Sequence, residues 1–178
     1  MHYIRDNLAV CGYHHIGKRE EFASHGFRAQ LQCTNNYDPW LTECLEVLLA
    51  PFDDGVPIPQ ELFHTAQDWL AGHWDSGCKI LISCAAGRSR SVTMAIALLS
   101  RKGGLSFLEA ANDVISRVPD AYPHPYVLAS ASLFSGEPLY LEQLQSIYAA
   151  VRNQPAYPWS LELVHDAALQ ASMRLFRG

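Results

Sequence analysis

"ILISCAAGRSRSVTMAIALLSRKGG", residues 80–104, is the stretch that decides the fold. It begins with an apolar run that ends at Cys84, continues with small residues and two arginines, and then follows a long apolar pattern. Short apolar runs are typical of buried strands, and longer periodic ones that stop at glycine are typical of helices. The order predicts a strand over Lys79–Ser83, a tight loop with Cys84 at its mouth, and a helix over Arg90–Lys102.

The same alternation continues on both sides of this stretch. Further strands are expected at Leu8–Cys11, at Arg28–Cys33 and, as a buried strand, at Cys44–Ala50. Further helices are expected at Lys18–His25, Gln60–Trp74, Ser106–Arg117, Tyr126–Leu133, Leu139–Val151 and Ser160–Phe176. Strands that alternate with helices predict the α/β class, with a central, mostly parallel twisted sheet flanked by helices and with extra C-terminal helices.

Size and composition indicate one globular domain with room for an appendage. The chain has 178 residues, of which 49% are hydrophobic and 17% charged, as in soluble proteins. The N-terminus, MHYIRDNLA, has no apolar core of a signal peptide, and no stretch is long enough to span a membrane. The five cysteines form no CxxC pair, which favours reduced thiols in the cytoplasm. The eight histidines have no metal-binding spacing, so neither a metal nor another cofactor is expected.

Charge is distributed unevenly along the chain. The net charge of −5 makes nucleic acid an improbable partner. The segment 76–108 nevertheless lacks Asp and Glu, and it contains Lys79, Arg88, Arg90, Arg101 and Lys102. A local cluster of cations in an acidic protein favours a small anionic ligand. An ordinary solvated face is the alternative interpretation.

The loop from Cys84 to Arg90 has the features of a binding site for a tetrahedral oxyanion. Its backbone N–H groups, from Ala85, Ala86, Gly87, Arg88, Ser89 and Arg90, are expected to converge on the anion at the N-terminus of the following helix. Gly87 permits the backbone angles that such a loop needs. Arg90 can bind two oxygens of the anion with its planar guanidinium group.

The same surroundings favour the ionised form of the Cys84 thiol, because helix N-termini and nearby cations stabilise a thiolate. A thiolate below a bound phosphate predicts nucleophilic displacement at phosphorus through a phosphocysteine intermediate. Ser91 could donate a hydrogen bond to the sulfur and help it to leave in the second step. The alternative is that Cys84 is a small buried residue and that both arginines lie on the surface.

Displacement from phosphorus also needs a general acid to protonate the leaving oxygen. The loop PFDDGVPIP, residues 51–59, offers Asp53 and Asp54 directly after a strand. We expect the strands that precede this loop and the cysteine loop to be neighbours, which would bring both loops to one edge of the sheet. Asp and Gly are also common turn formers, so a purely structural role is the alternative.

The sequence resembles the dual-specificity phosphatases of the cysteine-dependent protein tyrosine phosphatase superfamily. The segment CAAGRSRS matches their C-x-A-G-x-S-R-S signature, and DDGVPIPQELFHTAQDWL is similar to their acid loop and following helix. The resemblance spans about residues 4–133. It implies a phosphotyrosine protein phosphatase-like fold, with a catalytic domain at 1–135 and a helical extension at 136–178 packed on it. It also implies Cys84 as nucleophile, Arg90 as phosphate clamp, Ser91 as loop hydroxyl, and Asp53, ten residues before Phe63, as general acid.

Two positions depart from the family pattern. Ser83 stands where the family has histidine, which puts the level of activity in question. Arg88 adds a cation at a variable loop position and could favour substrates with additional negative charge. The resemblance implies hydrolysis of phosphotyrosine and phosphoserine or phosphothreonine in proteins. The alternatives are a non-protein phosphate ester (a phosphoinositide, a nucleotide or RNA 5′-phosphate, or a phosphosugar) or a weakly active phosphate-binding module. Inorganic phosphate, sulfate and vanadate are expected to bind the loop.

Overall fold

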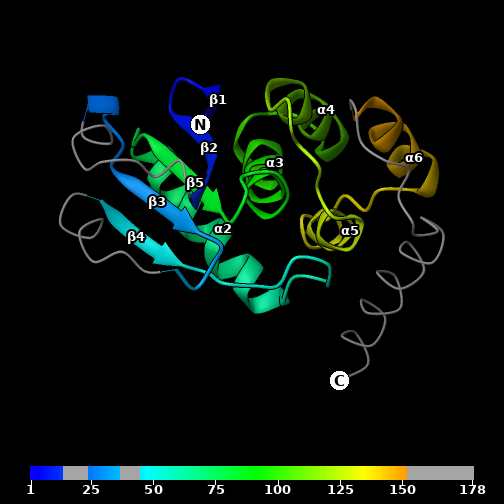
Figure 1. Ribbon diagram of the computed structural model, residues 1–178, viewed down its shortest axis with the longest axis horizontal. Helices are drawn as coiled ribbons and strands as arrows, with labels where there is room; N and C mark the ends of the chain where they lie inside the picture. The colour runs from blue at the N-terminus through cyan, green and yellow to red at the C-terminus, as the bar shows by residue number, and fades with distance from the viewer. Residues whose placement is uncertain (14–23, 37–44, 152–178) are drawn as a thin grey trace.

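One five-stranded sheet organises this computed structural model, which describes residues 1–13, 24–36 and 45–151 (Figure 1). The strands are β1 (His2–Arg5), β2 (Leu8–Gly12), β3 (Ala29–Gln32), β4 (Glu46–Leu49) and β5 (Ile80–Cys84). Their order in the sheet is β1-β2-β5-β3-β4. β1 is antiparallel to β2, and the other neighbours are parallel. This confirms the expected mostly parallel sheet of an α/β protein.

The central strand β5 shows why these residues form a sheet with two buried faces. Ile80 and Ile82 belong to the main core, whereas Leu81 lies in a smaller cluster with Ala9 and Phe27. Side chains alternate between the faces of a strand, so a continuous apolar run is needed when both faces are buried. The parallel pairing of β5 with both β2 and β3 places Cys84 at the carboxyl edge of the sheet.

Four helices gather on one side of the sheet (Figure 1). They are α2 (Gln60–Asp75), α3 (Arg90–Lys102), α4 (Phe107–Arg117) and α5 (Pro125–Phe134), and α6 (Leu141–Ala150) follows them. Nine consecutive residues of α3, 91–99, are buried, because the sheet and the three other helices surround it. The expected capping box at the start of α4 is present, with Ser106 and Glu109 bonded reciprocally. The site loop therefore joins the central strand to the central helix.

Three details of the sheet differ from the expectations. β1 was not expected, and it adds a short antiparallel edge next to β2. The expectation that the strands before the two loops are neighbours is wrong, because β3 lies between β4 and β5. β4 is an edge strand with Leu49 39% exposed, so it is not the buried strand that was expected. The helices expected at Ser160–Phe176 and, apart from its last residues, at Lys18–His25 lie outside the described residues.

The first part of the expected C-terminal extension packs into the same core as the rest of the chain. Leu144 and Ile147 of α6 are buried in the main cluster, and the Tyr148 hydroxyl donates a hydrogen bond to the Pro123 carbonyl at 2.8 Å. A division into a catalytic domain at 1–135 and an extension at 136–178 stays a prediction. Among the residues described by the structure, no helix has the length and apolar character needed to cross a membrane.

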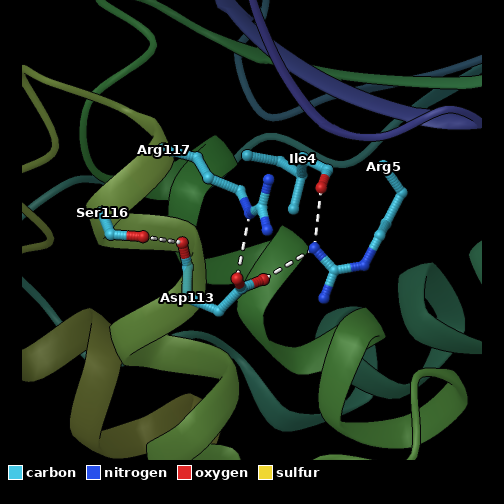
Figure 2. A network of polar contacts seen from close by, with 5 residues as sticks. All are labelled: Ile4, Arg5, Asp113, Ser116 and Arg117. Carbon is cyan, nitrogen blue, oxygen red and sulfur yellow. Dashed lines mark hydrogen bonds and ion pairs between the residues drawn. The ribbon is translucent and has the colours of Figure 1, made fainter.

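A charged network fastens β1 to α4 (Figure 2). Arg5 Nη1 donates to Asp113 Oδ2 at 2.7 Å and also to the Ile4 carbonyl, and Arg117 Nε donates to Asp113 Oδ1 at 2.9 Å. Burial opposes the charged form of the carboxylate, but the hydrogen bonds and positive charges of both arginines outweigh burial and lower the pKa of Asp113. The network therefore stabilises the fold while the carboxylate is ionised.

Asp113→Asn is expected to lower the free energy of unfolding at neutral pH by about 0.5–1 kcal/mol, as for a partly exposed ion pair. Because the pKa of Asp113 in the folded state lies below its ordinary value of 3.8, the stabilisation is present above that pH and is lost as the pH falls through the folded pKa. Urea unfolding at pH 7 and in acid measures this, with Asp120→Asn as the control. An equal difference at both pH values would contradict the account.

Candidate active site

The loop between β5 and α3 fits closely against the end of β2. Cys84 is the last residue of β5 and Arg90 the first of α3, so residues 85–89 form the tight loop that the sequence predicted. Gly87 has a φ of 75°, and a Cβ atom built on it would lie 2.3 Å from the backbone nitrogen of Gly12. Any other residue at Gly87 would therefore be strained and would collide with backbone.

The Cys84 sulfur points into this loop. The Gly87 N–H donates to Sγ at 3.2 Å, and the Ser91 Oγ lies 3.2 Å from Sγ, where either atom can be the donor. Cys84 is only 3% exposed, but it lines a hollow of about 390 Å³ together with Ala85 and Ala86. One backbone N–H and one hydroxyl of the loop segment therefore lie within hydrogen-bond distance of the sulfur.

Two other cysteines near the sheet edge cannot take the role of Cys84. Burial raises the pKa of Cys11 to about 12, and burial followed by the nearby Cys84 raises the pKa of Cys33 well above its ordinary value. Both side chains therefore stay protonated at neutral pH, and a thiol is a poor nucleophile compared with a thiolate.

Arg90 connects the loop to two neighbouring segments and keeps one edge of its guanidinium group unused. Nη1 donates to the Cys33 carbonyl at 3.1 Å and to the Phe52 carbonyl at 2.9 Å. Nε is buried and has no hydrogen-bond partner among the described residues. A buried donor without a partner is costly. Arg90 also lines the hollow that contains Cys84.

The two aspartates of the loop between β4 and α2 have different surroundings. Asp54 lines the hollow that contains Cys84, and its Oδ1 accepts a hydrogen bond from Ser89 Oγ at 2.6 Å. Asp53 lines an adjoining hollow of about 410 Å³, and Arg90 lines both hollows. Within the part of the chain that the structure describes, the Asp53 carboxylate has no hydrogen bond or ion pair. The structure thus places Asp54 in the hollow with Cys84, and Asp53 in a second hollow that Arg90 also lines.

Arg88 contacts the segment after α4, which forms a side of the hollow that the sequence did not reveal. Its Nε donates to the Asp120 carbonyl at 2.8 Å, and its own carbonyl accepts from the Tyr122 N–H at 2.8 Å. Arg88 and Tyr122 both line the hollow that contains Cys84. Tyr122 follows α4, far from the signature in sequence, and no local motif distinguishes it from a packing tyrosine.

Ser83, which replaces the usual histidine of the family, faces away from Cys84. Neighbouring residues on a strand point to opposite faces of the sheet. The Ser83 hydroxyl accepts a hydrogen bond from Gln30 Nε2 at 2.9 Å, and both residues are buried. The Ser83 hydroxyl thus has a partner inside the sheet, whereas Gln30 Oε1 is buried without a partner among the described residues. No cluster of three or more His, Cys, Asp or Glu side chains that could hold a metal ion occurs within the described ranges.

Known proteins resemble this chain in sequence over one segment and in structure over most of its length. No family model matches the chain. A segment of 59 residues is 41% identical to dual specificity protein phosphatase 1B of Arabidopsis thaliana, and it covers 33% of this chain and 35% of that protein. The match thus spans about a third of the curated relative.

Solved structures of other proteins have a similar fold, among them the following two. The crystal structure of human DUSP28 has a TM-score of 0.68 at 22% identity and covers 82% of this chain and 99% of that chain. A mouse putative dual specificity phosphatase complexed with zinc tungstate has a TM-score of 0.67 at 22% identity and covers 82% of this chain and 90% of that one. These findings confirm the resemblance to dual-specificity phosphatases and the phosphatase-like fold.

Proposed function

We propose that this protein is a cysteine-dependent phosphatase that hydrolyses phosphate monoesters on proteins through a phosphocysteine intermediate. The observation that carries the proposal is that Cys84 and Arg90 line the same hollow, with the Cys84 sulfur directed into the loop that joins them. A tetrahedral phosphate in this hollow would meet Arg90 and would bring its phosphorus above the nucleophile. The tungstate bound to the mouse relative, also a tetrahedral oxyanion, supports the assignment.

In the first step, the Cys84 thiolate attacks phosphorus. The S–P bond forms, the P–O bond to the leaving group breaks, and protonated Asp53 gives its proton to the leaving oxygen. The loop N–H groups from Ala85 to Arg90 and the Arg90 guanidinium would stabilise the charge on the three remaining oxygens. The product of this step is phosphocysteine together with a free alcohol or phenol.

In the second step, water replaces the sulfur. The Asp53 carboxylate removes a proton from a water molecule as the new O–P bond forms and the S–P bond breaks. Inorganic phosphate leaves, and Cys84 returns to the thiolate. The Ser91 hydroxyl, 3.2 Å from Sγ, is placed to donate a hydrogen bond to the departing sulfur. The reaction needs no cofactor.

One further substrate class is favoured by a particular residue. The Arg88 guanidinium lines the hollow, and only its Nε has a partner among the described residues. Its remaining nitrogens could bind a second anionic group, as on a phosphoinositide. We keep phosphoproteins as the main proposal. The reduced thiols that the mechanism requires fit a cytoplasmic location, which we include in the proposal.

A panel of phosphate esters tests this function. Phosphotyrosine, phosphoserine and phosphothreonine peptides, a phosphoinositide, a nucleotide monophosphate and a phosphosugar are compared by phosphate release, with and without vanadate. We expect hydrolysis of the peptides, and inhibition by vanadate. Hydrolysis of the phosphoinositide alone would select the second class, and retention of phosphopeptides without turnover would indicate a binding module. No turnover and no binding would reject the proposal.

A further inference from the structure

The Ser89 hydroxyl joins three segments at the site. Ser89 immediately precedes Arg90 and is 6% exposed. Its Oγ donates to Asp54 Oδ1 at 2.6 Å and accepts from the His124 N–H at 2.9 Å. The bond partners come from the loop before α2 and from the start of α5, each 35 residues away in sequence. The Ser89 side chain therefore connects the site loop to the loop before α2 and to the start of α5.

This arrangement replaces the bond that a serine usually makes at such a position. Ser89 is the N-cap residue of α3, where a serine side chain normally accepts from an N–H of the first helical turn. No such side-chain bond is present here, and the backbone angles of Ser89 are φ −121° and ψ −80°. The hydroxyl is directed to Asp54 instead. Ser89 thus makes a hydrogen bond to a residue distant in sequence instead of capping its own helix; we call this Ser89–Asp54 bond the tether.

Few hydrogen bonds fix the loop between β4 and α2 to the rest of the described structure. The Phe52 carbonyl is held by Arg90, and the Ile58 N–H donates to Ser130 Oγ at 3.0 Å. Between these two points, the bond from Ser89 to Asp54 is the hydrogen bond that connects residues 53–57 to the rest of the described structure. Asp53 immediately precedes Asp54 in the chain, and its carboxylate has no such bond to any residue that the structure describes.

We propose that Ser89 and Asp54 are positioning residues, and that their hydrogen bond holds Asp53 within reach of the leaving oxygen. The inference rests on the proposed phosphatase function and divides the work between the two aspartates. Asp54 anchors the loop because its oxygen is already an acceptor for Ser89. Asp53 keeps its carboxylate available to transfer the proton. The backbone N–H of Ser89 still serves the phosphate, while its side chain serves the acid loop.

Kinetics with a series of aryl phosphates tests this division of roles. Ser89→Ala and Asp54→Asn should each lower kcat by about 10- to 100-fold with poor leaving groups, as expected for a misplaced catalytic group. The fall should be smaller with p-nitrophenyl phosphate, and the dissociation constant for vanadate should stay within about threefold because the oxyanion ligands remain. The double variant should be no slower than the single ones, and Ser89→Thr, which keeps the hydroxyl, should recover most of the rate.

Asp53→Asn is the matched comparison for Asp54→Asn, since it replaces the neighbouring carboxylate with the same amide. It should lower kcat by about 100- to 10,000-fold with poor leaving groups. In the wild type, kcat should decline at high pH because the general acid loses its proton, and Asp53→Asn should abolish this decline. The Ser89 and Asp54 variants should keep that decline, because Asp53 is still present. If Asp54→Asn abolishes the decline and Asp53→Asn does not, Asp54 is the acid and the inference is wrong. A large loss of vanadate affinity in Ser89→Ala would equally overturn it.

A second measurement does not depend on turnover. Urea unfolding of the two single variants and the double variant forms a double-mutant cycle. A hydrogen-bonded pair predicts that the effects of the two substitutions on unfolding are not additive. Additive effects would show that the tether does not exist in solution. If the wild-type protein hydrolyses no phosphate ester while the cycle shows coupling, the proposed function fails and the tether stands.

Discussion

Arg90→Lys is expected to lower kcat/KM by about 100- to 1,000-fold, although the substitution keeps the positive charge. The guanidinium group of Arg90 does two things at once. Nη1 binds the Cys33 and Phe52 carbonyls, and Arg90 also lines the hollow that contains Cys84. A lysine has one nitrogen and lacks the planar fork, so it cannot hold both carbonyls and also bind two oxygens of a phosphate.

Initial rates with p-nitrophenyl phosphate measure the effect of Arg90→Lys. Urea unfolding of the same variant separates lost chemistry from a lost fold, because two backbone carbonyls also lose their donor. Arg101→Lys is the matched control: Arg101 belongs to the same helix but pairs with Asp68 at the surface. The control should retain its rate. A folded Arg90→Lys variant that keeps more than about a fifth of the wild-type kcat/KM would refute the role of the fork.

Cys84→Ser is expected to reduce turnover by about 10,000-fold or more, because the reaction loses its nucleophile. A serine hydroxyl in the same place is much harder to ionise than a thiol, so the S–P bond has no efficient substitute. Phosphate binding should persist, since the Arg90 guanidinium and the loop N–H groups are unchanged. The dissociation constant for inorganic phosphate and the rate of p-nitrophenyl phosphate hydrolysis report these two properties separately.

Cys78→Ser serves as the control for loss of a thiol. Cys78 is a free, partly buried cysteine in the turn after α2, away from the loop. This variant should hydrolyse the substrate at the wild-type rate. Appreciable turnover by a homogeneous Cys84→Ser protein would show that another group attacks the phosphorus.

The segment from β5 to α3 was predictable because its signals are short in range. An apolar run up to Cys84, a glycine with a positive φ at 87, and an apolar helix from Arg90 to Lys102 each reflect local preferences of the backbone. The start of α4 was predictable for the same reason, since Ser106 and Glu109 form a reciprocal cap. Local chemistry thus indicated where elements begin and end.

The arrangement of the strands was not predictable from these signals. Hydrophobic periodicity does not encode which strands pair, so the position of β3 between β4 and β5 could not be inferred. For the same reason, the sequence did not predict that β4 would lie at the exposed edge of the sheet. An apolar run can fit a buried strand or an edge strand, and only the neighbours in the sheet decide between them.

The candidate site, too, could be predicted where its residues are close in sequence and not where they are distant. Cys84, Ser91 and the loop N–H groups come together because they belong to one short segment. The bonds of Ser89 with Asp54 and His124 join residues that are 35 positions apart, and no spacing rule connects them. The position of Tyr122 in the lining of the hollow was not predicted for the same reason. Long-range polar contacts depend on how the loops meet, which the sequence pattern does not specify.

The phosphocysteine intermediate is the central claim, and trapping it is the most direct test. The wild-type protein is mixed with a reactive aryl phosphate, quenched in acid within the first turnovers, digested and examined by mass spectrometry. The account predicts the added mass of one phosphoryl group on the peptide that contains Cys84, and an unmodified peptide in the Cys84→Ser protein. Phosphate release with no label on Cys84, or with the label on another residue, would contradict it.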